Sequence, residues 1–126
     1  MNFFNTKEIN GKEEFKKQNT LEERQREAKK ILEKYPDKIP MYISKQPSSK
    51  IQEIDKHKFL MPIDLTVGQL LFVIRKRIQI PPECALFVFI NGHLINQSML
   101  MSEVYKQEKD IDNFLYIEYS GEATFG

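Results

Sequence analysis

One short stretch in the middle of the chain constrains its fold more than any other. Thr66-Val-Gly-Gln69 has the form of a capping box, in which two side chains satisfy free amide groups at a helix start. Apolar residues follow at helical spacing, and the three cations Arg75–Arg77 stand where they complement the helix dipole. Pro81-Pro82 prevents continuation. Residues 66–78 are therefore expected to form the clearest helix of the chain.

Four other runs have the character of strands. They span residues 38–45, 58–61, 85–90 and 114–119. The run 85–90 is apolar on both faces, which suits a central strand that is covered on both sides. Asn91-Gly92 follows it and is a strong hairpin signal, because both residues tolerate positive φ. A short strand over 93–95 is expected to return from this turn.

Two further segments carry helical signals. Thr20-Leu-Glu-Glu23 is a second capping box, and apolar residues follow it near helical spacing. Tyr35-Pro36 should end this helix, because a residue before proline avoids the α region. Residues 98–108 suggest a short third helix. Residues 1–19 are polar and weakly patterned, so they are expected to be mobile or to form a short, loosely docked helix.

The expected order is helix, strand, strand, helix, strand, short strand, helix, strand. Periodicity indicates the α+β class. After its first helix, this is also the order of a β-grasp, or ubiquitin-like, domain, in which a mixed four-stranded sheet packs on one central helix, although periodicity alone does not fix that topology. We therefore expect an N-terminal helical extension over 1–19, partly flexible, a ubiquitin-like domain with a leading helix over 20–120 and a flexible tail over 121–126.

Charge is unevenly distributed along the chain. The formal net charge is only +1, but residues 36–80 hold eight Lys and Arg against four Asp and Glu, whereas residues 81–126 hold two against seven. A nucleic-acid-binding protein should be more uniformly basic, so no nucleic-acid partner is expected. A basic groove for an acidic peptide is compatible with this pattern, and so is an ordinary solvated charge distribution.

The sequence lacks the signals that are typical of several other classes of protein. No apolar run approaches the roughly 18 residues of a membrane span, and no signal-peptide pattern opens the chain. The single cysteine, Cys84, favours a reducing cytosolic or nuclear setting and has no histidine nearby in sequence. His57 and His93 lack metal-ligand spacing, and no phosphate-binding loop or catalytic set is visible. We therefore expect no metal, no cofactor and no enzymatic activity.

Six motifs in constant order identify a family. They are Glu33–Pro40, Asp55–Pro62, Asp64–Gln69, Ile74–Ile78, Ala85–Asn91 and Phe114–Ser120. Together they resemble the GABARAP and microtubule-associated light-chain group of autophagy ubiquitin-like proteins. The resemblance covers the chain from about Thr20 to Gly126 with nearly constant spacing, and six linked motifs are far more specific than any one of them.

The resemblance implies that Gly126 is joined to the amine of phosphatidylethanolamine. A glycine has no Cβ, so its carboxylate can enter a narrow active-site channel. In this family an activating enzyme adenylates the carboxylate and takes it onto a cysteine, a conjugating enzyme passes it to the lipid, and a cysteine protease deconjugates it. The chain would then be a carrier, cytoplasmic and on the autophagosome membrane when lipidated. The alternative is an unconjugated β-grasp adaptor in vesicle trafficking or microtubule association.

The resemblance also implies recognition of cargo receptors through an aromatic residue followed three positions later by an aliphatic one. Such a peptide adds to an edge strand, here 58–61, whose alternation puts Phe59 and Met61 on one side and Leu60 on the other. Anchors three positions apart require pockets roughly 10 Å apart at about 3.3 Å per residue.

Motif matching assigns residues to each part of this groove. The aromatic pocket would use Glu27, Ile31, Pro40, Lys58, Leu60 and Phe114. The aliphatic pocket would use Phe59, Met61, Pro62, Leu65, Leu70 and Val73. Acidic residues beside the motif would pair with Lys56, Lys58 and Arg77. The alternative for Ile31, Leu60, Leu70 and Phe114 is that they are ordinary core residues.

Overall fold

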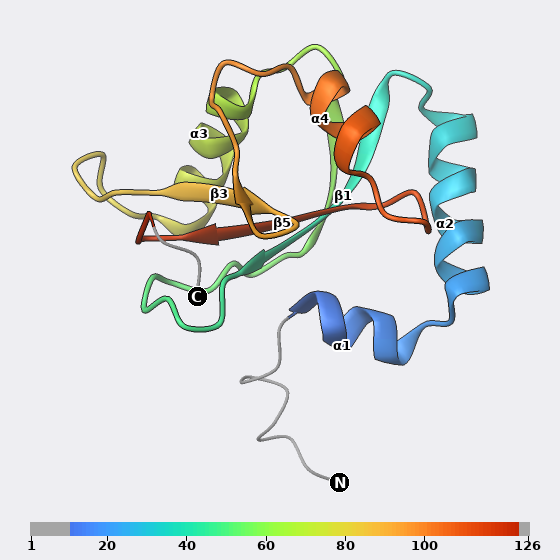
Figure 1. The fold of residues 1–126 in the computed structure, drawn as a ribbon, viewed down its shortest axis with the longest axis horizontal. Coiled ribbons are helices and arrows are strands. Elements are labelled where there is room, and N and C mark those ends of the chain that lie inside the picture. The colour runs from blue at the N-terminus through green and yellow to red at the C-terminus, as the bar shows by residue number, and fades with distance from the viewer. Residues whose placement is uncertain (1–10, 124–126) are drawn as a thin grey trace, which may run out of the picture.

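The computed structural model describes residues 11–123, shown as a ribbon in Figure 1. The elements are α1 (Gly11–Gln18), α2 (Leu21–Lys34), β1 (Lys38–Lys45), β2 (Lys58–Pro62), α3 (Val67–Ile78), β3 (Phe87–Ile90), β4 (His93–Leu94), α4 (Met101–Glu108) and β5 (Leu115–Ser120). Their order agrees with the order predicted from the sequence. Helix α1 lies within the segment for which the sequence left a mobile stretch or a short helix as alternatives.

The strands form one mixed sheet in the order β2-β1-β5-β3-β4. Strands β1 and β5 run parallel in the middle, and the other three pairings are antiparallel. This arrangement confirms the expected ubiquitin-like α+β fold. The sheet has a fifth strand because the two-residue return after Asn91-Gly92 pairs with β3 through Phe89 and Ile90. Strand β2 stands at one edge of the sheet, beside β1.

Helix α3 packs on one face of this sheet as its central helix (Figure 1). The capping box at its start is formed by Thr66 and Gln69, as predicted, and Gln79 closes the helix in the left-handed region at φ 59°. Its buried residues join side chains of β1, β3 and β5 in the main core, among them Leu70, Ile74, Ile43, Val88 and Ile117. Burial of apolar side chains such as these is the dominant favourable contribution to folding.

A second, aromatic cluster covers the opposite side of β1 and β5. It contains Phe15 from α1, Ala28 from α2, Tyr42 from β1, and Phe114 and Tyr116, with Ile31 of α2 packed against it. The division follows from strand alternation, because Tyr42 points away from its neighbours Met41 and Ile43, which lie in the main core. Helices α1 and α2 are therefore held on the sheet through this second cluster.

A loop before β5 fastens both N-terminal helices with ion pairs. Lys16 Nζ of α1 lies 2.7 Å from Asp110 Oδ1, and Arg24 Nη1 of α2 lies 2.7 Å from Asp112 Oδ2. Asp112 is fully buried and also accepts hydrogen bonds from the Tyr116 hydroxyl and the Phe114 amide. Since the buried carboxylate has several donors, its charge is compensated.

Candidate functional site

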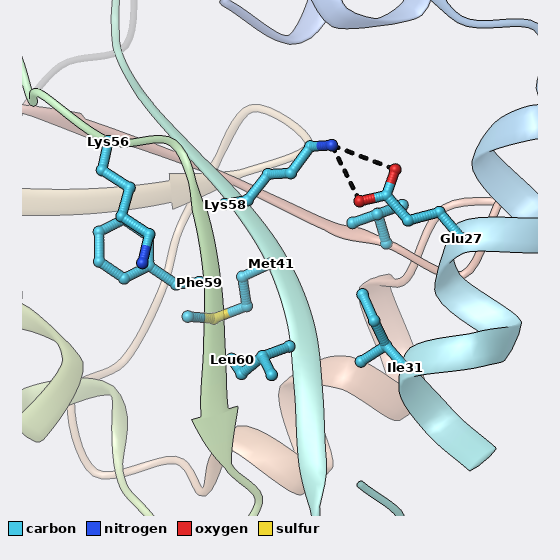
Figure 2. A pocket seen from close by; sticks show the side chains of 8 residues that line it. Glu27, Ile31, Met41, Lys56, Lys58, Phe59 and Leu60 are labelled. Atoms are coloured by element: carbon cyan, nitrogen blue, oxygen red, sulfur yellow. Dashed lines mark hydrogen bonds and ion pairs between the residues drawn. The ribbon is translucent and has the colours of Figure 1, made fainter. Parts of the chain in front are cut away.

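A cavity of about 390 Å³ lies between α2 and the edge strand β2. It is lined by Glu27, Ile31, Met41, Lys56, Lys58, Phe59, Leu60 and Phe114. Figure 2 shows β2 and α2 on opposite sides, with Leu60 reaching from β2 and Ile31 from α2. The walls are mainly apolar, and the charged groups come from Glu27 and two lysines. Such a site suits an apolar side chain held beside a charged one.

Five of the six residues predicted for the aromatic pocket line this cavity, namely Glu27, Ile31, Lys58, Leu60 and Phe114. The structure does not bring Pro40 into the wall, because Pro40 is buried within β1 opposite Leu60. Met41 also lines the cavity, although the sequence assigned it to neither pocket. Met41 lies opposite Phe59 in the sheet, a register that the sequence does not specify.

An ion pair spans the mouth of the cavity. Lys58 Nζ lies 2.8 Å from Glu27 Oε2 and 3.1 Å from Glu27 Oε1, as the dashed lines in Figure 2 show. Both side chains are partly exposed, at 48% and 37%. The same Lys58 ammonium lies 4.9 Å from the centroid of the Phe15 ring. The Lys58 ammonium therefore has two contacts, the Glu27 carboxylate and the Phe15 ring, and it is partly exposed beside the cavity.

Two more cations flank the ring of Phe59 in β2. Lys56 Nζ and Arg77 Cζ lie 5.3 and 5.8 Å from the Phe59 ring centroid. Arg77 Nε also donates to Asp55 Oδ1 at 2.8 Å, and this hydrogen bond holds the pKa of Asp55 below its ordinary value. The three cations predicted to meet an acidic partner thus lie around β2 and are all exposed.

The residues predicted for the aliphatic pocket are buried to different degrees. Met61 and Leu70 lie inside the main core, so the core alternative holds for Leu70. Phe59, Leu65 and Val73 are half-buried and pack against that core. Pro62 is also half-buried, at the end of β2. Phe59, Pro62, Leu65 and Val73 thus keep part of their apolar surface accessible, and we call these four residues the apolar shelf; Phe59 also lines the cavity.

Ile31, Leu60 and Phe114 were the other three residues that could have been ordinary core residues, and the structure buries them to different degrees. Leu60 is 40% exposed, so it is a surface wall of the cavity rather than a core residue. Phe114 is 1% exposed and lines the cavity, so it belongs both to the aromatic cluster and to the site. Ile31 is half-buried against the same cluster. The predicted alternation of β2 is confirmed, since Met61 is buried on one side and Leu60 is exposed on the other.

The position of β2 gives the site its second component. An edge strand directs alternate backbone N–H and C=O groups away from its neighbour, where they can pair with an added strand. Strand β2 pairs with β1 on one side over Lys58–Pro62. The other side of β2 is therefore an edge of the sheet, in the same strand whose Lys58, Phe59 and Leu60 line the cavity.

The predicted conjugation residue, Gly126, lies outside the described residues. Up to Ala123 the chain follows β5 directly, and its first residues are hydrogen-bonded. The Gly121 amide donates to Ser49 Oγ at 3.1 Å, and the Glu122 amide donates to Ser120 Oγ at 3.0 Å. The segment that leads to Gly126 is thus attached at its base to the loop after β1.

Comparison with known proteins identifies the family. The family model described as "Autophagy protein Atg8 ubiquitin like" matches residues 23–126. The chain belongs to the Atg8 family. Membership confirms the resemblance to GABARAP-type and light-chain-type proteins and places the chain among the ubiquitin-like proteins of autophagy.

Curated Atg8 relatives match nearly the whole chain. It is 52% identical over 115 residues to autophagy-related protein 8B of Oryza sativa subsp. indica, a match that covers 91% of this chain and 97% of the relative. It is 50% identical over 115 residues to autophagy-related protein 8 of Candida glabrata, with 91% and 98% covered. Autophagy-related protein 8e of Arabidopsis thaliana is 53% identical over 112 residues, with 89% and 92% covered.

A solved Atg8 structure has the same fold. The crystal structure of Trypanosoma brucei ATG8 superposes with a TM-score of 0.82 at 48% identity and covers 89% of this chain and 97% of its own. Among the described residues of this Atg8-family chain, no helix has the length and apolar character needed to cross a bilayer.

Proposed function

We propose that this chain is an autophagy modifier that is attached through Gly126 to phosphatidylethanolamine and recruits partners by binding aromatic-x-x-aliphatic peptides along β2. The observation that carries the proposal is the apolar cavity at the mouth of which Lys58 and Glu27 are paired, beside an edge strand. The chain itself would be the substrate that is passed along the relay and not a catalyst.

A bound peptide would extend the sheet as a strand beside β2. Its aromatic side chain would enter the cavity between Leu60 and Ile31, where apolar walls remove it from water. Its aliphatic side chain, about 10 Å further along the strand, would rest on the shelf formed by Leu65 and Val73. An acidic residue beside the motif would pair with Lys58 or with the cations that flank Phe59.

Attachment through Gly126 rests on the family match, which extends to that residue. Activating and conjugating enzymes would transfer the Gly126 carboxylate to the lipid amine, and a cysteine protease would reverse the reaction. Burial contributes roughly 0.8 kcal/mol per CH₂, and one acyl chain binds only marginally, so the two chains of the lipid would keep the conjugate on the membrane. The free form would be cytoplasmic and the lipidated form would reside on autophagosomes.

Two experiments test the two parts of this function. Incubation with activating and conjugating enzymes, ATP and phosphatidylethanolamine liposomes should give a lipidated product with the wild type and none with Gly126→Ala. Titration with an acidic Trp-x-x-Leu peptide should give saturable amide shifts on α2, β2 and the start of α3. Lipidation without peptide binding would remove the recruitment role, and peptide binding without lipidation would favour the unconjugated adaptor.

A further inference from the structure

Phe15 of α1 stands directly behind two residues of the cavity. Its ring meets the Phe114 ring edge-on, with centroids 5.5 Å apart and an interplanar angle of 78°. On another side the Lys58 ammonium lies 4.9 Å from the Phe15 centroid. Phe15 does not itself line the cavity. It is therefore placed to affect a ligand only through Phe114 and Lys58.

We propose that Phe15 is a positioning residue for peptide recognition, which fixes the Phe114 ring in the cavity wall and holds the Lys58 ammonium at the cavity mouth. The inference rests on the proposed peptide-binding function and deepens it. Helix α1 lies outside the β-grasp sheet, and through Phe15 it would contribute indirectly to peptide binding. The inference also assigns the Phe15–Lys58 contact to the selection of peptides with acidic flanks.

The Phe15 ring has a rigid support of its own. It stacks on Tyr42 of β1 with centroids 4.8 Å apart and an interplanar angle of 20°, and it is only 6% exposed. Stacked and edge-on aromatic contacts favour particular ring orientations. Since Tyr42 belongs to a central strand, the orientation of Phe15, and with it that of Phe114, is set by the sheet.

Lys58 has less restraint from its surroundings than Phe114, so a second contact matters more for its position. A lysine side chain is flexible, and an exposed ion pair such as Lys58–Glu27 restrains it only weakly. The negative face of the Phe15 ring attracts the ammonium from a second direction. A carboxylate in a peptide can replace Glu27 while the ring keeps the ammonium in place, so less side-chain freedom is lost on binding.

The docking of α1 can be separated from the Phe15 contact, because α1 is attached in a second way. Lys16 Nζ is paired with Asp110 Oδ1 at 2.7 Å and lies 4.8 Å from the Tyr116 ring centroid. Lys16 is absent from the cavity lining. Lys16→Met therefore weakens the docking of α1 without removing a ring from behind Phe114, and it is the matched control for Phe15→Leu.

The test is calorimetric titration with two peptides, Asp-Asp-Asp-Trp-x-x-Leu and its counterpart with Asn for each Asp. Phe15→Leu keeps apolar volume and removes the ring. We expect it to raise the Kd of the acidic peptide about two- to fivefold, which corresponds to the loss of one cation–π contact at an exposed site. The Kd of the neutral peptide should rise less. In a Lys58→Met background, Phe15→Leu should have no further effect on the preference for the acidic peptide. Phe15→Tyr, which keeps the ring, should bind as the wild type does.

Three results would overturn the proposal. The first is unchanged affinity of Phe15→Leu for both peptides, and the second is an equal loss in Lys16→Met, which would assign the effect to α1 docking in general. The third is a loss in Phe15→Tyr as large as in Phe15→Leu. A wild-type chain that binds neither peptide would instead refute the proposed recognition function itself, so the two failures are distinguishable.

Discussion

Lys58 and Glu27 form an ion pair 2.8 Å long that connects the edge strand β2 to helix α2 across the mouth of the cavity. Both side chains are partly exposed, so the pair is worth on the order of 0.2–1 kcal/mol and can open without disturbing the fold. Displacement of the Glu27 carboxylate would therefore leave the Lys58 ammonium available to an acidic ligand.

Glu27→Gln should therefore increase affinity for an acidic peptide. The substitution removes the carboxylate that competes with the ligand for Lys58, and the expected gain is about two- to fivefold at low salt. The gain should shrink as salt is added, because exposed charges are screened. Calorimetry at two salt concentrations checks this, with the neutral peptide as control. Weaker binding of the acidic peptide would mean that Glu27 contributes to the bound state.

Leu60→Ala should weaken binding of a Trp-x-x-Leu peptide by roughly five- to a hundredfold, since the loss of apolar contact in the cavity costs about 1–3 kcal/mol. Because Leu60 is 40% exposed, the variant should stay folded. The matched control is Leu94→Ala, which removes a 54% exposed leucine from β4 at the opposite edge of the sheet. Equal affinity of the two variants in calorimetry would exclude Leu60 from the site.

The docking of α1 should weaken in acid. Burial acts to raise the pKa of Asp110, but hydrogen bonds from Lys16 and the Asp112 amide, together with the charges of Lys16 and Lys12, outweigh it, so the pKa lies below its ordinary value. A depressed carboxyl pKa contributes stability that is complete above the unfolded value, about 3.9, and is lost as the pH falls through the lower folded value. Amide shifts of α1 should follow this titration.

Asp110→Asn provides the control for the acid experiment. Its α1 amides should resemble those of the acid form already at neutral pH, and their dependence on pH below about 4 should disappear. If the same titration persists in Asp110→Asn, another carboxyl group controls the helix.

Ile74→Ala should be among the most destabilising single substitutions. Ile74 is fully buried in α3 against the sheet, and such truncations cost about 2–5 kcal/mol. Ile111→Ala removes the same atoms from a side chain that is 74% exposed and should change stability by less than about 0.5 kcal/mol. Urea unfolding of both variants gives the comparison, and similar midpoints would contradict the assignment of the main core.

The elements could be predicted where local signals were strong. The capping boxes at Thr20 and Thr66 form as expected, and burial on both faces of the run 85–90 is confirmed by Val88 and by Phe89, which is 2% exposed. The short return strand was predicted from the Asn91-Gly92 turn signal, and β4 confirms it as a two-residue strand paired with β3. The sequence did not show that this strand adds a fifth member to the sheet, because that depends on its pairing with β3.

The residues of the site were predicted less completely than the fold, because strand register and depth of burial depend on tertiary structure. Met41 enters the cavity because it stands opposite Phe59, and pairing register is a tertiary property. Alternation shows on which side of β2 Met61 lies but not that Met61 is only 4% exposed within the main core. The part played by Phe15 has no periodic signal either, since it is the one buried residue of a short polar helix.

The parallel pairing of β1 with β5 also determines when this protein can fold during synthesis. Strand β5 lies between β1 and β3, so a nascent chain that stops before Leu115 has only two separate strand pairs, β2–β1 and β3–β4. Two-stranded units are marginal in water, and neither pair can complete the layer that covers α3. Folding therefore waits until the last strand has left the ribosome, and a chain that stops before Leu115 cannot complete the sheet.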